Sequence, residues 1–194
     1  MKRLMVALIF WGVGVTAFAQ TAERGRGFYI DAGIGYGGII YSDESNTMVK
    51  NIQDDGFNRI TLAVDGIGWA ALQNLYAVGS FTGFADRFFK SSDYKQLNTG
   101  LYGLGIKWYP FFSGKYLQFG ADIGLASTGL VTYLNSSTDT VISDPGFGMK
   151  ISAAYDFDST MTGPALLLGG DALLCFIEGE NRTCFSLFAK FVFK

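Results

Sequence analysis

Seven charged residues stand singly within stretches of apolar and small residues, a pattern typical of charges that face the interior of a protein. They are Asp31, Lys107, Asp122, Lys150, Asp156, Asp171 and Lys190. Buried charges need partners, so these residues predict a lumen charge network. Counted from the expected turns, Asp122, Lys150 and Asp171 should meet at mid-height, Asp31 could pair with Lys190 nearer the periplasmic side, and Lys107 should lie near the depth of Asp156. Such a network could act as a gate or ion path, or it could simply fill the interior, and the second interpretation is the simpler one.

Histidine, the side chain best suited to proton transfer near neutral pH, is absent from all 194 residues. A general base would then need a carboxylate or lysine with a strongly shifted pKa, and no arrangement in the sequence favours one. A metal site built from a Cys/His cluster is disfavoured for the same reason. The sequence therefore predicts that the protein is not an enzyme and uses no cofactor or metal.

Two cysteines, Cys175 and Cys184, flank a short polar link. If the hairpin is symmetric about Gly179 and Glu180, the two cysteines face each other, and an oxidising compartment would permit a disulfide. Two cysteines in direct opposition make a somewhat strained bridge. A pair of reduced, packed thiols is therefore the alternative.

The N-terminal residues have the features of a secretory signal peptide. A basic pair, Lys2 and Arg3, precedes an apolar stretch, and Ala17-Phe18-Ala19 fits the small-x-small rule for cleavage. We predict a signal peptide at residues 1–19 and a mature domain at residues 20–194. The alternative is an uncleaved membrane anchor, although the apolar run is short for a spanning helix.

The mature chain is acidic and unusually apolar. Without Lys2 and Arg3, 13 basic side chains remain against 17 acidic ones, a net charge of −4. This balance disfavours nucleic acid as a partner, because phosphate binding needs a concentrated basic face. The chain is 49% hydrophobic with 26 glycines, yet beyond the N-terminal stretch no apolar run approaches the roughly 18 residues of a spanning helix. A membrane β-barrel explains both properties, because its lipid-facing residues alternate with lumen-facing ones.

A period of two, the period of β-strands, runs through most of the mature chain. In residues 28–36 the even positions are apolar and the odd ones are Tyr, Asp or Gly, while residues 117–125 and 147–157 carry apolar side chains at odd positions. Less regular strands are expected at 59–69, 76–85, 99–109, 165–177 and 183–193. The predicted fold is all-β: an eight-stranded antiparallel up-and-down transmembrane β-barrel, preceded by a cleaved signal peptide.

The lengths of the connections alternate along the chain. The expected links are long at 41–57, short at 70–75, long at 86–98, short at 110–115, long at 127–145, short at 158–163 and short at 178–182. Membrane barrels have long outer loops and short periplasmic turns, so both termini are predicted in the periplasm and the long loops outside the cell. The segment 127–143 is rich in Thr, Val and Leu and could continue its strands as a β-ribbon.

Aromatic residues gather at the strand ends predicted to lie on the periplasmic side, as in the girdles of membrane barrels. They are Phe28, Trp69, Trp108, Tyr109, Tyr116, Tyr155, Phe157, Phe191 and Phe193. A soluble barrel with an apolar cavity is the alternative. Its outer face would carry many charges, whereas the polar face here has one or two per strand and many glycines.

The final strand, at residues 184–194, resembles the C-terminal assembly signal of bacterial outer-membrane proteins, in which alternate apolar positions lead to an aromatic residue. The matching positions are Phe185, Leu187, Phe191 and Phe193, with Lys194 following. Residues 27–36 and 105–111 are also similar to strand openings and turn approaches of small barrels of the OmpA, OmpX and OmpW type. The resemblance implies location in the outer membrane of a Gram-negative-type bacterium, contact with its lipid, and assembly by the barrel-assembly machinery through the last strand.

Two functions fit such a barrel. The first is an envelope-structural or surface-interaction role, in which the extracellular loops contact a ligand. Phe88, Phe89 and Tyr94 are candidate contacts, because aromatic residues among charges suit partner binding, although the two phenylalanines could instead anchor the barrel at the membrane interface. We prefer this role.

The second function is a narrow channel for small hydrophobic molecules or ions, as the OmpW resemblance implies. Lumen-facing Leu167, Leu173 and Phe188 would favour it. The small lumen of an eight-stranded barrel counts against it. The enzymes known among such barrels use histidine in their active sites, and this chain has none.

Overall fold

The computed structural model describes residues 27–42, 57–63, 66–72, 74–90, 93–110, 117–134, 137–157 and 164–193. The predicted signal peptide at residues 1–19 lies outside the described residues. Every helix or strand assigned within these ranges is a β-strand. The same ranges contain no helix with the length and apolar character needed to cross a membrane.

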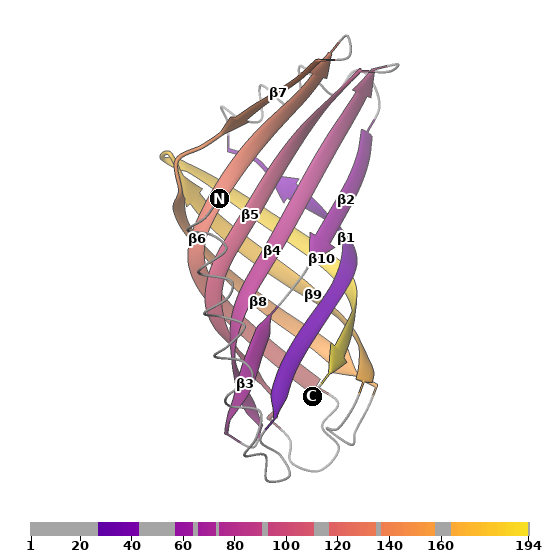
Figure 1. Cartoon of the computed structure of the whole chain (residues 1–194), viewed down its shortest axis with the longest axis vertical. Coiled ribbons are helices and arrows are strands. Elements are labelled where there is room, and N and C mark those ends of the chain that lie inside the picture. Colours follow the sequence, from indigo (N-terminus) through magenta and orange to yellow (C-terminus); the bar gives the residue numbers. More distant parts are fainter. Residues whose placement is uncertain are drawn as a thin grey trace, which may run out of the picture.

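Ten strands form one antiparallel sheet that closes on itself (Figure 1). They are β1 (Phe28–Ile40), β2 (Phe57–Ala63), β3 (Ile67–Leu72), β4 (Leu75–Lys90), β5 (Asp93–Trp108), β6 (Leu117–Leu134), β7 (Ser137–Ile142), β8 (Gly146–Asp156), β9 (Pro164–Ile177) and β10 (Glu180–Phe193). β2 and β3 share one position between β1 and β4, and β7 and β8 share the position beside β6. The ring closes where β10 pairs with β1. The predicted eight-stranded up-and-down barrel is therefore confirmed.

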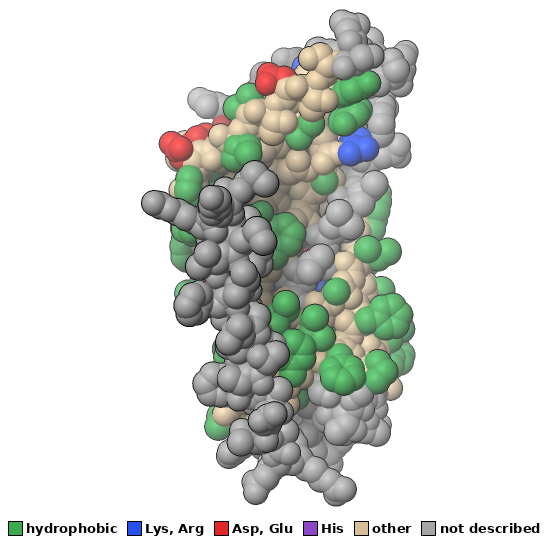
Figure 2. All heavy atoms as spheres, in the orientation of Figure 1, with side chains coloured by type: hydrophobic (Ala, Val, Ile, Leu, Met, Phe, Trp, Pro, Cys, Tyr) green, Lys and Arg blue, Asp and Glu red, His purple; other side chains and the backbone are tan. Residues whose placement is uncertain are grey.

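The predicted alternation sets the two faces of the sheet. In β1, Tyr29 and Asp31 are buried in the lumen, whereas Ile34 and Tyr36 are 66% and 69% exposed on the outer surface. The same division continues around the ring, and Figure 2 shows apolar side chains spread over the outer surface. A water-soluble barrel has the opposite arrangement. The apolar outer face suits contact with lipid.

Two groups of buried apolar residues fill much of the interior. One contains Tyr29, Tyr76, Val78, Tyr109, Ala154, Ala165, Leu167, Phe188 and Val192. The other contains Ile39, Phe84, Leu101, Ala126, Leu173, Cys175, Ile177 and Cys184. Along β5, for example, Lys107 lies between Tyr109 of the first group and Leu101 of the second, so the two groups lie on either side of the level of Lys107.

Exposed aromatic residues form contacts near the end of the barrel at which both β1 begins and β10 ends. Trp108 lies against Phe119, with ring centroids 6.2 Å apart, and Tyr155 lies against Phe157 at 4.9 Å. The prediction that Tyr109 belongs to this girdle is wrong, because its side chain is fully buried in the lumen. The alternation of faces cannot be extended past Trp108, where β5 ends. The Tyr109 amide donates to the Asn74 carbonyl oxygen and does not continue the strand ladder. Tyr116 lies outside the described residues.

At the opposite end, β4, β5, β6 and β7 extend beyond the closed barrel (Figure 1), and residues 57–59 of β2 pair with residues 86–88 of β4 along its other side. We call this part the raised sheet: residues 86–90 of β4, 93–99 of β5, 128–134 of β6, and all of β7. The prediction of a long polar loop at 86–98 is wrong, because strand pairing continues to Lys90 and Asp93. The β-ribbon predicted within 127–143 is confirmed by the pairing of β6 with β7.

β9 and β10, by contrast, end low in a tight hairpin. Glu178 and Gly179 both have positive φ, 53° and 81°. That combination is typical of a type I′ turn, whose twist matches the twist of the flanking strands. The rim of the barrel is therefore high on the β4–β7 side and low at the β9–β10 hairpin.

Candidate functional site

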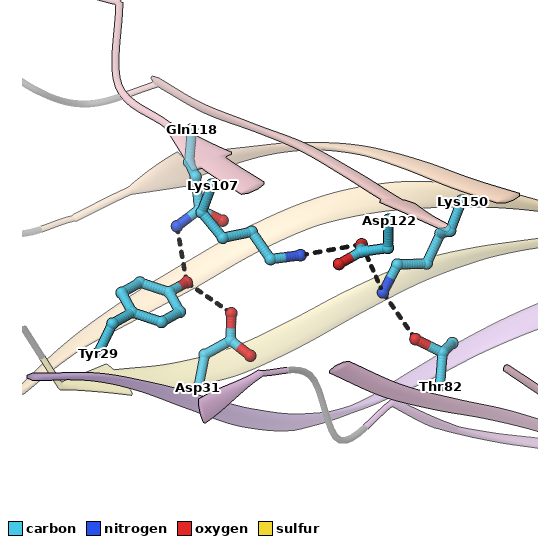
Figure 3. A network of polar contacts seen from close by, with 7 residues as sticks. All are labelled: Tyr29, Asp31, Thr82, Lys107, Gln118, Asp122 and Lys150. Atoms are coloured by element: carbon cyan, nitrogen blue, oxygen red, sulfur yellow. Dashed lines mark hydrogen bonds and ion pairs between the residues drawn. The ribbon is translucent and has the colours of Figure 1, made fainter. Parts of the chain in front are cut away.

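The centre of the lumen holds one carboxylate between two lysines (Figure 3). An oxygen of Asp122 on β6 lies 3.3 Å from Lys107 Nζ on β5 and 3.2 Å from Lys150 Nζ on β8. Lys150 also donates to Thr82 Oγ1 at 2.6 Å. All four residues are at most 1% exposed. Because water does not screen the charges there, each lysine depends strongly on its contact with the Asp122 carboxylate.

Two glycines provide the space for this cluster. Gly105 lies opposite Asp122, and a Cβ atom there would collide with the Asp122 carboxylate. A Cβ atom at Gly120 would collide with Ser152 Oγ and approach Lys107 Nζ to 3.0 Å. Glycine at both positions therefore lets large charged side chains cross a narrow lumen.

A second polar network spans the lumen between β1, β6 and the end of β5. Gln118 Nε2 donates to the hydroxyl oxygens of Tyr29 at 2.8 Å and Tyr109 at 2.7 Å. Each tyrosine in turn donates to a carboxylate: Tyr29 to Asp31 at 2.6 Å, and Tyr109 to Asp156 at 3.0 Å. The network links strands from different parts of the ring through side chains that are at most 4% exposed.

The structure places the seven predicted lumen charges inside the barrel, each at most 7% exposed. It brings Asp122 and Lys150 together, and adds Lys107, a pairing that the sequence did not predict. Asp171, expected beside them, accepts a hydrogen bond from Ser186 at 2.6 Å.

The last of these lumen charges, Lys190, lies on β10, with its ammonium 3.6 Å from the centre of the Phe188 ring, a favourable cation–π contact. Lys190 lies opposite Gly33 on β1, two residues along the chain from Asp31. Pairing of Lys190 with Asp31 stays a prediction.

The described interior contains five buried aspartates and three buried lysines. One aspartate, Asp122, binds two of the lysines. Each of the other four accepts a hydrogen bond from a hydroxyl group: Asp31, Asp86, Asp156 and Asp171. Hydroxyl donors therefore stabilise most of the lumen carboxylates, as expected of a packed interior in which every buried polar group needs a partner.

The direct opposition predicted for the cysteines is wrong. Cys175 lies opposite Arg182, and Cys184 opposite Leu173. The turn is centred on Glu178 and Gly179, one residue before the predicted centre, so the two cysteines are offset diagonally. Both are buried free thiols at the upper end of the lumen.

The predicted loop contacts lie in the raised sheet, on different faces. Phe88 is 3% exposed and packs inward against Leu97, with Tyr41 and Leu130 beside them. It therefore does not form an exposed contact, and the prediction for Phe88 is wrong. The side chain of Phe89 lies outside the described side chains.

Tyr94 lies on the outer face of the raised sheet. Its ring stacks on that of Tyr133 at 5.2 Å and 14°, and the Arg87 guanidinium lies 4.6 Å from its centre. Arg87 Nε donates to Gln96 Oε1 at 2.5 Å, and Gln96 Nε2 donates to Asn98 Oδ1 at 2.6 Å. Cross-strand pairs of this kind stabilise the sheet. These contacts were not predicted from the sequence, although residues 94, 96 and 98 share the strand period.

The short hairpin is attached to the base of the raised sheet. Arg182 on β10 donates to Thr128 Oγ1 on β6 and pairs with Glu180 at 3.1 Å. Glu178 at the turn accepts from the Asp144 amide at 3.0 Å. These contacts connect the two sides of the rim.

β7 is the exposed edge of the raised sheet. All six of its residues are exposed, and the only strand paired with it among the described residues is β6. Exposed edges with unpaired main-chain groups are sites at which further strands can add. The raised sheet with its β7 edge is thus the feature best placed to contact a partner.

Solved structures of small outer-membrane proteins resemble this fold. The structure of Ail, the attachment invasion locus protein of Yersinia pestis, in complex with the heparin analogue sucrose octasulfate, gives a TM-score of 0.58 at 9% identity, covering 88% of this chain and all of Ail. Neisserial surface protein A gives 0.53 at 15% identity, covering 88% of this chain and 99% of that one. No protein-family model and no curated protein sequence matches the chain. The chain therefore has the fold of the small eight-stranded outer-membrane β-barrels.

Proposed function

We propose that this chain is an integral outer-membrane protein that contacts a partner outside the cell through its raised sheet. The observation that carries the proposal is the raised sheet itself: paired strands, stiffened by cross-strand contacts, that extend beyond the apolar belt and end in an exposed edge. A closed barrel provides the anchor, and the raised sheet provides the contact surface.

The apolar outer surface supports the membrane location. Alternate residues of β10 face outward and are about half exposed or more: Phe185, Leu187, Phe191 and Phe193. The same strand closes the ring with β1, which suits a role as the assembly signal for the barrel-assembly machinery. In this proposal residues 1–19 are removed on export, both termini lie in the periplasm, and the raised sheet faces outward.

The structural neighbours support a surface role. Ail carries attachment and invasion in its name and binds a heparin analogue in its structure, and the Neisserial protein is named as a surface protein. We propose neither catalysis nor a bound cofactor for this chain.

The channel alternative is less well supported by the interior. Lys107, Asp122 and Lys150 fill the middle of the lumen at 1% exposure each, and the two groups of buried apolar residues lie on either side of the level of Lys107. An eight-stranded barrel leaves little space beyond its side chains. We expect the refolded mature protein to be silent in a planar bilayer, as should Lys150→Ala. Discrete openings whose size changes with Lys150→Ala would instead establish a channel.

The test of the proposal replaces the upper parts of β4 to β7 with short turns, each joining two residues that lie opposite each other in the structure. Asn-Gly replaces residues 87–96, joining Asp86 to its partner Leu97, and a second Asn-Gly replaces residues 130–141, joining Gly129 to its partner Ile142. Asn-Gly forms tight hairpin turns, so the barrel below should close normally.

Bacteria displaying the parent or the trimmed protein are then compared for adhesion to cultured epithelial cells. The parent should raise adhesion above that of cells without the protein, and the trimmed protein should not. Heat-dependent gel mobility verifies that both barrels are folded. Equal adhesion by folded parent and trimmed proteins would refute the role of the raised sheet.

A further inference from the structure

The free side of β7 presents a regular series of main-chain groups. The Ser143 amide donates to the Thr128 carbonyl oxygen at 2.8 Å, which makes this a hydrogen-bonded pair. Such pairs alternate along an antiparallel ladder, so Val141 and Asp139 also bond to β6. The N–H and C=O groups of Thr138, Thr140 and Ile142 must then point away from β6, toward the exposed edge.

This pattern selects the class of partner. Thr138, Thr140 and Ile142 are every second residue of β7. Each of them offers one main-chain donor and one main-chain acceptor along an extended line. Only another polypeptide in extended conformation matches that repeat over its length. β-branched Thr, Val and Ile on both faces of β7 also favour a neighbouring strand.

The exposed charged side chains on β7 and at its foot are acidic, and Lys95 lies two strands away from Asp139, across Thr132. Asp139 is exposed on the strand, and Asp144 and Glu178 are exposed at its foot. Arg182, which lies near this foot, is already paired with Glu180. Figure 2 shows acidic side chains along the flank where β7 lies in Figure 1, and its largest basic patch on the opposite flank. A basic segment would therefore be attracted to this edge.

A second copy in the same membrane does not fit the edge. Two such copies are related by rotation about the membrane normal, and bringing the same edge face to face requires about half a turn. Barrel strands are tilted by about 35–45° from the normal, so the two β7 strands would cross at roughly twice that tilt. Strands that cross at such an angle cannot form a ladder.

We propose that β7 binds a basic, extended segment of another protein as an added strand, held by the main-chain groups of Thr138, Thr140 and Ile142 and oriented by Asp139. This inference rests on the proposed function, because it assigns the contact made by the raised sheet. Only a few residues of the partner need to be extended, so a disordered basic tail or an exposed edge strand would be suitable.

The experiment uses the mature protein in nanodiscs and a fluorescein-labelled peptide, acetyl-Val-Lys-Thr-Lys-Val-Thr-Val-amide. Two control peptides carry either Glu in place of both Lys, or N-methyl groups at the consecutive central residues, which removes main-chain donors on both edges. We expect binding by the first peptide alone, weakened by added salt. Equal binding by the N-methylated peptide would overturn the proposal, because it would show that main-chain pairing is not involved.

Three variants of the protein locate the contact. Thr140→Pro removes the outward-pointing N–H without touching the β6 ladder and should weaken binding about tenfold, as expected for loss of an interfacial hydrogen bond plus a steric block. Thr140→Val, the matched control, should bind like the parent. Asp139→Asn should weaken binding and reduce its salt dependence. Unchanged binding by Thr140→Pro would overturn the proposal, and heat-dependent mobility verifies that each barrel is folded.

Two further measurements separate this inference from its alternatives. If Thr140→Cys cross-links two copies in one nanodisc and the peptide does not compete, the occupant is a second copy and the peptide proposal fails. Thr140→Pro is also tested for adhesion beside the trimmed protein. If the trimmed protein loses adhesion and Thr140→Pro keeps it, the β7 contact is refuted and the proposed function stands. If the trimmed protein and Thr140→Pro both keep adhesion, the proposed function is refuted.

Discussion

Asp122→Asn tests whether the central cluster is a stabilising ion-pair network. The two lysine contacts, at 3.3 and 3.2 Å, each correspond to about 5 kcal/mol of attraction at an effective dielectric constant of about 20. Burial of the charges and repulsion between the lysines offset much of this. Removing one partner of a buried pair typically costs about 3–5 kcal/mol. Asn keeps the volume and one acceptor, so we expect a loss of about 3 kcal/mol.

The loss is measured as the free energy of unfolding in urea, with the protein refolded in lipid vesicles and followed by tryptophan fluorescence. With slopes of about 1–3 kcal/mol per molar urea, the midpoint should fall by about 1–3 M. Lys150→Met, which leaves the Lys107–Asp122 pair intact, should lose less than Asp122→Asn.

A triple variant provides the decisive control. Lys107→Met, Asp122→Asn and Lys150→Met together remove every charge of the cluster and should recover most of the lost stability, because no buried ammonium then lacks this carboxylate. Asp122→Asn within about 0.5 kcal/mol of the parent, or a triple variant no more stable than the single one, would refute this account of the lumen.

Three other predictions follow from the packing. Gly105→Ala should lower the free energy of unfolding by about 1–3 kcal/mol through overpacking against the central carboxylate, whereas Gly100→Ala, whose Cβ would meet its nearest atoms at 3.8 Å, should be nearly neutral; equal losses in urea titrations would contradict this. Tyr133→Leu should cost about 0.5–1.5 kcal/mol by removing the aromatic stack, and faster limited proteolysis confined to the raised sheet would show it. Cys175 and Cys184 should react with a maleimide only after unfolding, as mass spectrometry can determine, and rapid labelling of the folded barrel would contradict their burial.

The strand pattern was predictable because the two faces of a membrane barrel meet different solvents. Residues 117–125 and 147–157 alternate in the sequence as they do in the structure, with Asp122 and Lys150 inside. Whether a charged residue is buried can be predicted from the face of the strand on which it lies, without knowing where its partner is. The facing of the predicted lumen charges could therefore be read from periodicity alone.

The pairing of side chains was less predictable, because it depends on the offset between neighbouring strands. Lys107 and Asp122 meet because β5 and β6 are staggered so that Gly105 lies opposite Asp122, and no local pattern fixes that stagger. The cysteine prediction was wrong for the same reason: moving the turn centre by one residue, to Glu178 and Gly179, shifts every opposite pair in the hairpin.

The polar composition of residues 86–98 hid a pair of strands. Polar residues are typical of loops, but a sheet that rises into water carries polar side chains on its exposed face. Phe88 and Leu97 kept the inward period beneath that polar face, and this apolar pair was the signal available in the sequence. A prediction based on periodicity in place of composition would have extended both strands.

The central cluster also constrains the order in which the barrel can enter a bilayer. Lys107, Asp122 and Lys150 belong to β5, β6 and β8, three adjacent positions of the ring. A single charged side chain crossing the hydrocarbon costs about 2.5–3.5 kcal/mol, so each of these strands would cross alone at a penalty. Paired beforehand, the three strands carry a partly neutralised cluster shielded on one face of a curved half-barrel. These three strands are therefore expected to pair with one another before or while they enter the hydrocarbon, and not to cross it singly.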